Sequence, residues 1–416
     1  MTGREKLRAA LDHRVGPIPL DFGSTAVTGM HVSVVADLRR HYGLEKRPVK
    51  VNEPYQMLGE VEPDLREALG VDIVGVYPRG TIFGFPLDGW KSWRAPWGQE
   101  LLVPGDFNVT YDGNDVLMYP QGDTSAAPSG RMPEGGFFFD TIIRQAPINE
   151  DNLNVEDNLE EFGPISDEDL AHFKREAAAA AETGCGVIVN FGGTGFGDIA
   201  LVPGPFLKNP KGIRDVAEWY MSTVARRDYV HAIFEHQAKH ALANLARIRE
   251  VVGDQVDAVF VCGTDFGTQQ GQFCSPETFE DLWLPYYRKV NDWLHANTTW
   301  KTFKHSCGAV FPLLDRFVDA GFDILNPVQC SAADMAPRDL KDHAGDRLVF
   351  WGGAVDTQKT LPFGTPQQVR DQVMGRCAVF GHQGGFVCNA IHNVQAKTPV
   401  ENVVAMVEAL HEFNVE

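Results

Sequence analysis

The chain has 416 residues, of which 44% are hydrophobic, and its 37 Lys and Arg stand against 56 Asp and Glu, for a formal net charge of −19. A chain with this much negative charge repels phosphate backbones and anionic lipid. We therefore expect no nucleic-acid partner and no membrane partner. The seven cysteines are scattered and odd in number, and no apolar run is long enough to span a bilayer, so we expect a cytoplasmic protein with reduced thiols.

Short apolar runs alternate with amphipathic helical stretches along almost the whole chain. Each run is apolar on both faces, which is typical of buried parallel strands. Helix starts fit between the runs, as at Ser275-Pro276 and Thr365-Pro366, where a capping side chain precedes a proline. Eight such units predict a closed (β/α)8 TIM barrel, built as a single domain over residues 1–416. The predicted strands are Ile18–Phe22, Asp72–Tyr77, Gly186–Phe191, Asp257–Cys262, Trp300–His305, Asp323–Val328, Leu348–Gly353 and Gly385–Ala390.

Residues 80–144 interrupt this alternation. The segment is rich in Gly, Pro, Trp and Phe, and it contains hairpin signals at Asp112-Gly113 and at Pro133–Gly136. We expect an antiparallel β-rich insertion after the second barrel strand, within the same domain and placed over the mouth of the barrel.

A glycine-rich run, Gly192–Gly197, follows the third predicted strand. Its spacing is not the G-x-G-x-x-G of a dinucleotide-binding loop, and no acidic residue ends the next short strand. We interpret it as a loop of the barrel and not as a nucleotide site.

Polar side chains gather where the predicted strands end. In a barrel these ends share one rim, which is where the active sites of such folds lie. Asp265, set among glycines after the fourth strand, is predicted to act as a general acid or base or to accept a hydrogen bond from substrate, although an Asx-turn explains it equally well. Asp21, which ends the first strand, is the second predicted acid–base group. The side chains predicted to line a substrate pocket are Tyr77, Asn190, Asn326, Gln329, Trp351 and His392.

A histidine and a cysteine two residues apart, His305 and Cys307, follow the fifth predicted strand. Imidazole and thiolate are good zinc ligands, and catalytic zinc takes three protein ligands and leaves one position open. Cys388 ends the eighth strand on the same rim and is predicted to be the third ligand, with His392 as the alternative. Cys330, in a predicted loop, is a further candidate for the third zinc ligand. Without a third ligand, a buried cysteine beside a hydrogen-bonded histidine explains the pair better than a zinc site does.

Three segments of the C-terminal half resemble the uroporphyrinogen decarboxylase superfamily. They are KHSCGAVFPLLDRFVDAGFDILNPVQ, LVFWGGAVDTQKTLPFGTPQQVR and TPVENVVAMVEA, and a looser similarity extends back to GREKLRAALDH near the N-terminus. The fold of that superfamily is a (β/α)8 barrel, which agrees with the eight predicted strands.

The two main branches of the superfamily differ in what they bind. True decarboxylases hold porphyrinogen carboxylates with an arginine-bearing N-terminal stretch. The corresponding segment here, residues 17–25, contains no arginine, and none occurs between Arg14 and Arg39. A polyanionic substrate would lack its clamp, so we expect no porphyrin decarboxylation.

The other branch consists of cobalamin-dependent methyltransferases, whose zinc motif is His-x-Cys followed after a long gap by Cys. His305, Cys307 and Cys388 match that pattern. In the better-known thiol methyltransferases Thr-Pro closely follows the last cysteine, whereas here residues 389–397 intervene before Thr398-Pro399. His392 within that stretch therefore stays open as the third ligand.

The resemblance implies a zinc-dependent methyltransferase that moves a methyl group between a small methylated substrate (a methyl ether, a betaine or a thiol) and a corrinoid (cobalamin) cofactor or a corrinoid protein. One alternative is a metal-independent decarboxylase in which Asp21 and Asp265 carry out acid–base chemistry. A second alternative is a non-catalytic barrel that binds a small molecule or a corrinoid. A homodimer is compatible with each of the three.

Overall fold

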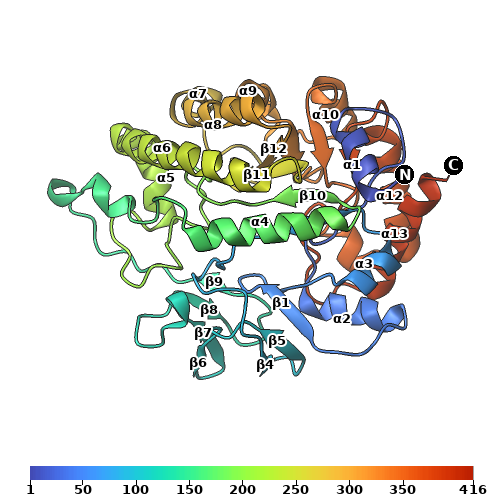
Figure 1. Cartoon of the computed structure of the whole chain (residues 1–416), viewed down its shortest axis with the longest axis horizontal. Coiled ribbons are helices and arrows are strands. Elements are labelled where there is room, and N and C mark those ends of the chain that lie inside the picture. Colours follow the sequence, from blue (N-terminus) through green and yellow to red (C-terminus); the bar gives the residue numbers. More distant parts are fainter. Residues whose placement is uncertain (416) are drawn as a thin grey trace.

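The computed structural model describes residues 1–415 and shows a barrel of parallel strands surrounded by helices (Figure 1). Seven strands form one parallel sheet in the order β15-β14-β13-β12-β11-β10-β3. Their bounds are β3 Ile73–Val76, β10 Gly186–Val189, β11 Ala258–Cys262, β12 Lys301–His305, β13 Ile324–Asn326, β14 Val349–Trp351 and β15 Phe386–Val387.

The first predicted strand closes the gap between β15 and β3. Leu20 pairs in parallel with Cys388, and the backbone N–H of Cys388 donates to the carbonyl of Pro19 at 2.9 Å. On the other side, the N–H of Asp72 donates to the carbonyl of Leu20 at 2.9 Å. All eight predicted strands therefore take their places in the barrel, and the predicted (β/α)8 fold is confirmed.

Helices cover the outside of the barrel. Several begin with the expected caps; the side chains of Ser275 and Thr365, for example, accept the N–H groups of Thr278 and Gln368. The helices are α1 Gly3–Leu11, α2 Val32–His41, α3 Pro63–Leu69, α4 Asp167–Glu182, α5 Val216–Ala225, α6 Arg227–Val252, α7 Pro276–Leu282, α8 Leu284–Asn297, α9 Leu314–Asp319, α10 Pro337–Ala344, α11 Thr360–Phe363, α12 Pro366–Phe380 and α13 Val400–Phe413.

The interior of the barrel is a packed core that α1 closes at one end. Helix α1 contacts β3, β10 and β15. Its Leu7, which is fully buried, packs with interior residues of the strands such as Ile188, Phe303 and Trp351. Because this end is filled with apolar side chains, the opposite rim is left for a site.

The predicted insertion is present after β3 and is antiparallel. Its strands are β4 Lys91–Arg94, β5 Glu100–Val103, β6 Val109–Asp112, β7 Asp115–Met118, β8 Gly130–Met132 and β9 Asp140–Thr141. They form a sheet β6-β7-β8-β9 and part of a second sheet, β2-β1-β5-β4. Strands β1 (Val49–Glu53) and β2 (Leu58–Gly59) of that second sheet precede β3 in the chain and were not expected from the sequence. The insertion is thus anchored on a segment outside its own range.

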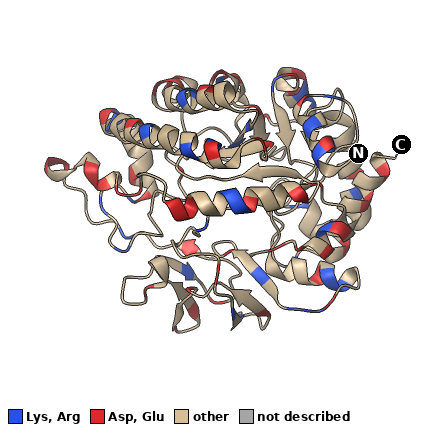
Figure 2. Cartoon of the chain, viewed as in Figure 1, with Lys and Arg blue, Asp and Glu red and all other residues tan. Residues whose placement is uncertain are grey.

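Charged residues lie mainly on the outer helices and loops, while the barrel strands are largely uncharged (Figure 2). Within residues 1–415, no helix combines the length and the apolar character that crossing a bilayer requires.

Candidate metal and substrate site

Three side chains at the C-terminal rim of the barrel bring metal-binding atoms together. One ligand atom each from His305, Cys307 and His392 lies within 4.8 Å of the other two. The Cys307 Sγ is 3.4 Å from His305 Nε2, and the two imidazole rings meet edge to face with centroids 5.4 Å apart. Two imidazoles and one thiol form a donor set that suits zinc.

The alternation of side chains along β12 directs His305 into the barrel. Phe303, two residues earlier, belongs to the interior core, so His305 points to the same side. Lys304 lies between them and points outward, where its Nζ donates to the carbonyls of Thr264 and His305 at 2.5 and 2.6 Å. The strand therefore presents its imidazole to the site and its ammonium to the helix layer.

Asn326, at the end of β13, determines which nitrogen of His305 carries the proton. Its Nδ2 donates to the carbonyl of Trp351 at 2.8 Å, and this bond turns its Oδ1 toward His305 Nδ1, 2.7 Å away. Because that oxygen only accepts, Nδ1 of His305 holds the proton and Nε2 is left with a lone pair. Burial lowers the pKa of His305 to about 4, so the ring is neutral at pH 7. This is the state in which histidine binds metals.

His392 lies in the loop after β15 and is also neutral at pH 7. Burial, together with the neighbouring His305, lowers its pKa to about 4. The backbone N–H of Asn393 donates to His392 Nδ1 at 2.8 Å, so in this structure the ring proton is on Nε2. Metal binding through Nδ1 would replace this hydrogen bond, and binding through Nε2 would require the other tautomer.

Asp265 lies beside Cys307, as expected for a functional carboxylate at the end of β11. Its Oδ1 accepts the backbone N–H of Cys307 at 2.7 Å and lies 3.8 Å from His305 Nε2. Burial, and then the negative charge of Asp265, raise the pKa of the Cys307 thiol well above its usual value. A thiol so placed becomes a thiolate only when a positive charge is held next to it.

The prediction that Cys388 is the third metal ligand needs correction. Cys388 is fully buried and belongs to the outer core between the strands and α12. A hydrogen bond with Cys377 of α12, together with burial, raises the pKa of its thiol. The preceding Val387 belongs to the interior core, so alternation along β15 turns Cys388 outward. His392, the alternative from the sequence, takes its place in the group.

Asp21 also needs correction as a catalytic group. It is fully buried, and both Ser24 Oγ and Trp351 Nε1 donate to its Oδ2, at 2.8 and 2.9 Å. Burial raises the pKa of Asp21 to about 6. Asp21 ties the first strand to β14, and it is not among the described residues that line the cavity.

A cavity of about 410 Å³ opens beside the group of His305, Cys307 and His392. Of the predicted pocket residues, Tyr77, Asn190 and His392 line it, as does the predicted acid–base residue Asp265. Asn326, Gln329 and Trp351 lie behind the wall. There Gln329 Oε1 accepts the N–H of Gly308 at 2.7 Å and so holds the loop that carries Cys307. Asn326 and Gln329 therefore position the site without contacting the cavity.

Two carboxylates that line the cavity were missed from the sequence. Glu53 ends β1, and its oxygens accept the N–H groups of Tyr55 and Gln56 at 2.9 and 2.7 Å. Asp198 lies in the loop after β10. A strand pattern over Val49–Glu53 was the only available signal for Glu53, and nothing in the sequence links that segment to the rim of the barrel.

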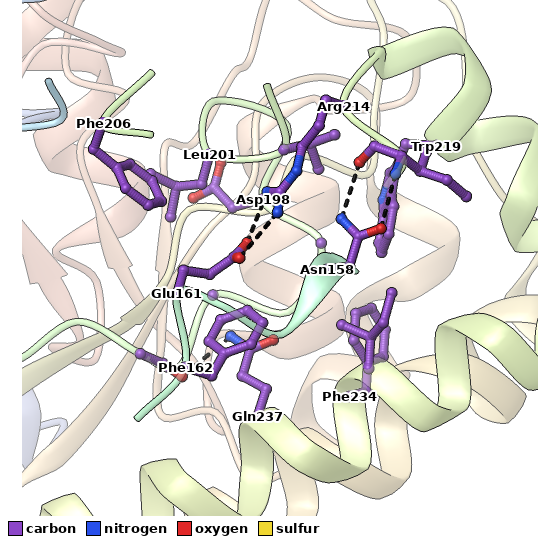
Figure 3. A pocket seen from close by; sticks show the side chains of 16 residues that line it. Asn158, Glu161, Phe162, Asp198, Leu201, Phe206, Arg214, Trp219, Phe234 and Gln237 are labelled. Carbon is purple, nitrogen blue, oxygen red and sulfur yellow. Dashed lines mark hydrogen bonds and ion pairs between the residues drawn. The ribbon is translucent and has the colours of Figure 1, made fainter. Parts of the chain in front are cut away.

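A smaller cavity, of about 190 Å³, lies on the other side of the glycine-rich loop and shares Asp198 with the first (Figure 3). Gly193, Gly195 and Gly197 line it together with aromatic residues. Its arginine, Arg214, is 1% exposed and is paired through two nitrogens with Glu161, at 2.9 and 3.1 Å. The loop thus forms a wall between two cavities, in line with its interpretation as a barrel loop.

Comparisons with known proteins agree with the fold. The family model described as uroporphyrinogen decarboxylase (URO-D) matches residues 207–413, a range that contains His305, Cys307 and His392. A uroporphyrinogen decarboxylase of Psychromonas ingrahamii is 28% identical over 192 residues, which is 44% of this chain and 51% of that protein. One of Chromohalobacter salexigens is 26% identical over 211 residues, which is 48% of this chain and 56% of that protein. The matches thus span about half the length of these curated relatives.

Among solved structures, a methyltransferase from Methanosarcina mazei superposes over 99% of both chains, with a TM-score of 0.56 and 14% sequence identity. At this identity the likeness concerns the fold alone. The sequence match over the half of the chain that forms most of the rim is what assigns the family. This chain therefore carries a domain of the uroporphyrinogen decarboxylase family over residues 207–413.

Proposed function

We propose that the protein is a zinc-dependent methyltransferase, which moves a methyl group between a small methylated substrate in the cavity and a corrinoid or a corrinoid protein. The observation that carries the proposal is the convergence of His305, Cys307 and His392 beside that cavity. We include the corrinoid in the proposal because of the resemblance to the methyltransferase branch. The likeness of the fold to that of a methyltransferase supports this choice.

The residues of the site fit zinc. His305 is neutral and presents the lone pair of Nε2, and Asn326 fixes its orientation. Cys307 supplies a soft donor in a place where burial alone would keep it protonated. Zinc held there would lower the pKa of a bound thiol, or stabilise an oxygen or nitrogen leaving group as the methyl departs.

The remaining residues of the chain position the substrate and move protons. Asp265 lines the cavity next to Cys307, where its carboxylate can exchange a proton with a substrate heteroatom. The cavity would position the methyl-bearing substrate beside His305, Cys307 and His392, and such positioning supplies much of the rate enhancement of a displacement reaction.

The lining of the cavity argues against the decarboxylase alternative. None of the described residues that line it is Lys or Arg. A porphyrinogen carries several carboxylates, and these need arginine or lysine to hold them. The cavity therefore lacks the anion-binding residues that a uroporphyrinogen decarboxylase, as the curated relatives are named, would need for its substrate.

Metal analysis of the purified protein tests the proposal. We expect roughly one zinc per chain in the wild type and strong loss of zinc in His305→Ala, Cys307→Ala and His392→Ala. Cys388→Ala is the matched control, because it removes a buried thiol outside the group, and it should keep its zinc. Wild-type protein should also transfer methyl groups to reduced cobalamin from at least one member of a panel of methyl ethers, betaines and methyl thioethers, as followed by visible absorbance. Metal-free wild type, or decarboxylation without metal, would contradict the proposal.

A further inference from the structure

The charged groups of the main cavity are of one sign. Glu53, Asp198 and Asp265 line it, and its lining within residues 1–415 contains no Lys or Arg. Asp265 adjoins the candidate metal ligands, where its charge offsets that of a metal cation. Glu53 and Asp198 are left as negative groups that nothing in the cavity neutralises.

The contacts of these two carboxylates come from neutral backbone donors. Glu53 accepts the N–H groups of Tyr55 and Gln56, and Asp198 Oδ1 accepts the N–H of Ala200 at 3.0 Å. Burial raises the pKa of Glu53 to about 7 and that of Asp198 to about 6. No cation lowers the pKa of Glu53, and for Asp198 burial outweighs the opposing effect of the charge of Lys304. Asn52 Oδ1, another acceptor at the cavity wall, is buried without a hydrogen-bond partner.

Three basic side chains near the cavity have partners outside it. Lys304 points out of the barrel toward two carbonyls and the ring of Phe266. Arg214 faces the smaller cavity and is paired with Glu161 (Figure 3). Arg79 forms ion pairs with Glu168 and Asp169 at 3.0 and 3.1 Å. None of the three lines the main cavity or forms an ion pair with Glu53 or Asp198.

The rest of the lining also suits a cation. Four aromatic side chains face the cavity, and the faces of such rings attract ammonium groups. The net charge of −19 draws cations toward the protein from solution. The aromatic residues are Tyr55, Tyr77, Phe206 and Phe260.

We infer that the main cavity binds a small organic cation, whose positive charge is attracted by the Glu53 and Asp198 carboxylates of the lining and whose methylated end is directed toward His305, Cys307 and His392. The inference rests on the proposed function in one respect: the cation is the methyl-bearing substrate. The resulting specificity is for a compound with a positive charge at one end and a methylated heteroatom at the other. Neutral ethers of the same shape, and carboxylates that carry no positive charge, would bind more weakly.

Binding of three probes of similar shape tests the inference by calorimetry. The probes are choline, its neutral tert-butyl analogue and the carboxylate pivalate. We expect wild-type protein at pH 8 to bind choline at least about tenfold more tightly than the neutral analogue, and pivalate least. Glu53→Gln and Asp198→Asn should each abolish most of the preference for choline. Glu60→Gln is the matched control, because Glu60 lies close by in sequence but outside the cavity lining.

Two variants are needed because Glu53 also holds the turn at Tyr55 and Gln56, so Glu53→Gln alone could act through folding. Thermal unfolding checks that both variants remain folded. A wild-type protein that binds the neutral analogue as tightly as choline, or variants that keep the preference, would overturn the inference. Zinc content is measured on the same samples. Zinc without a preference for choline refutes only the inference, and a preference without zinc refutes only the proposed function.

Discussion

At the scale of single residues, the site depends on Asn326 as much as on the residues that face the cavity. Asn326 links the carbonyl of Trp351 to Nδ1 of His305 and so selects the tautomer that leaves Nε2 available. The amide contacts no substrate and no cavity. Its effect on function passes entirely through His305, which makes it a positioning residue.

Replacing Asn326 by alanine should weaken zinc binding while leaving the three ligands in place. Loss of such an outer hydrogen bond commonly lowers metal affinity by roughly 10–100-fold. Competition with a chelator measures the affinity. Asn291→Ala is the matched control, because Asn291 is another buried asparagine that donates to a carbonyl, that of Ala320 at 2.8 Å, but it lies in helix α8 of the outer layer and not at the rim. Equal zinc affinity in the two variants would show that Asn326 only supports the fold.

The pKa of Glu53 predicts how cation binding depends on pH. At a pKa of about 7, Glu53 is mostly protonated at pH 6 and mostly ionised at pH 8. Because the cation binds the ionised form, choline should bind roughly tenfold more tightly at pH 8 than at pH 6. Asp198, with a pKa of about 6, adds to the loss at the acidic end. The histidines of the cavity stay neutral in this range, since their pKa values are about 4.

Calorimetric titrations of wild type and Glu53→Gln at pH 6 and pH 8 measure this dependence. The variant should show a much smaller change between the two values. Choline affinity that is the same at both values in the wild type would contradict the assignment of Glu53.

At the scale of elements, strand alternation explains both the success and the failure of the sequence predictions. The pattern that puts Phe303 and His305 on one side of β12 also puts Val387 inside and Cys388 outside on β15. The prediction of Cys388 as third ligand rested on its place at the end of the last strand and on the family motif, and neither specifies to which side of the strand the side chain points. Alternation along β15 directs Cys388 at the helix layer, from which its side chain cannot reach the interior of the rim. His392, in the loop that follows, lies with His305 and Cys307 instead.

Helix α1 is an element whose role is stability and not chemistry. Its Leu7 is fully buried in the closed end of the barrel. Leu7→Ala should leave a cavity and lower the free energy of unfolding by about 2–5 kcal/mol. Denaturant unfolding measures the change, with the exposed Val15→Ala as a control expected to stay within about 0.5 kcal/mol. Zinc content of the folded variant should not change, because the site lies at the other rim. Loss of zinc would mean that the two ends of the barrel are coupled.

At the scale of the whole molecule, the barrel could be predicted because its evidence is local. Eight apolar runs and the helices between them are visible in the sequence, and closure follows from their number. The role of β1 could not be predicted, because its pairing with β5 joins segments about fifty residues apart. Glu53 lies at the end of this strand, where it pairs with Leu58 of β2 and lines the cavity. The two carboxylates Glu53 and Asp198 therefore could not be assigned to the cavity from the sequence, whereas the candidate metal ligands could.

The central claim is that one sulfur and two imidazoles hold zinc at this rim. X-ray absorption at the zinc edge counts these ligands directly in the zinc-loaded wild-type protein. We expect one sulfur at about 2.3 Å, together with nitrogen or oxygen ligands at about 2.0–2.1 Å, and imidazole scattering from two rings. A shell with two sulfurs would mean that a second cysteine, such as Cys388 or Cys330, binds the zinc in place of a histidine, and would contradict the account.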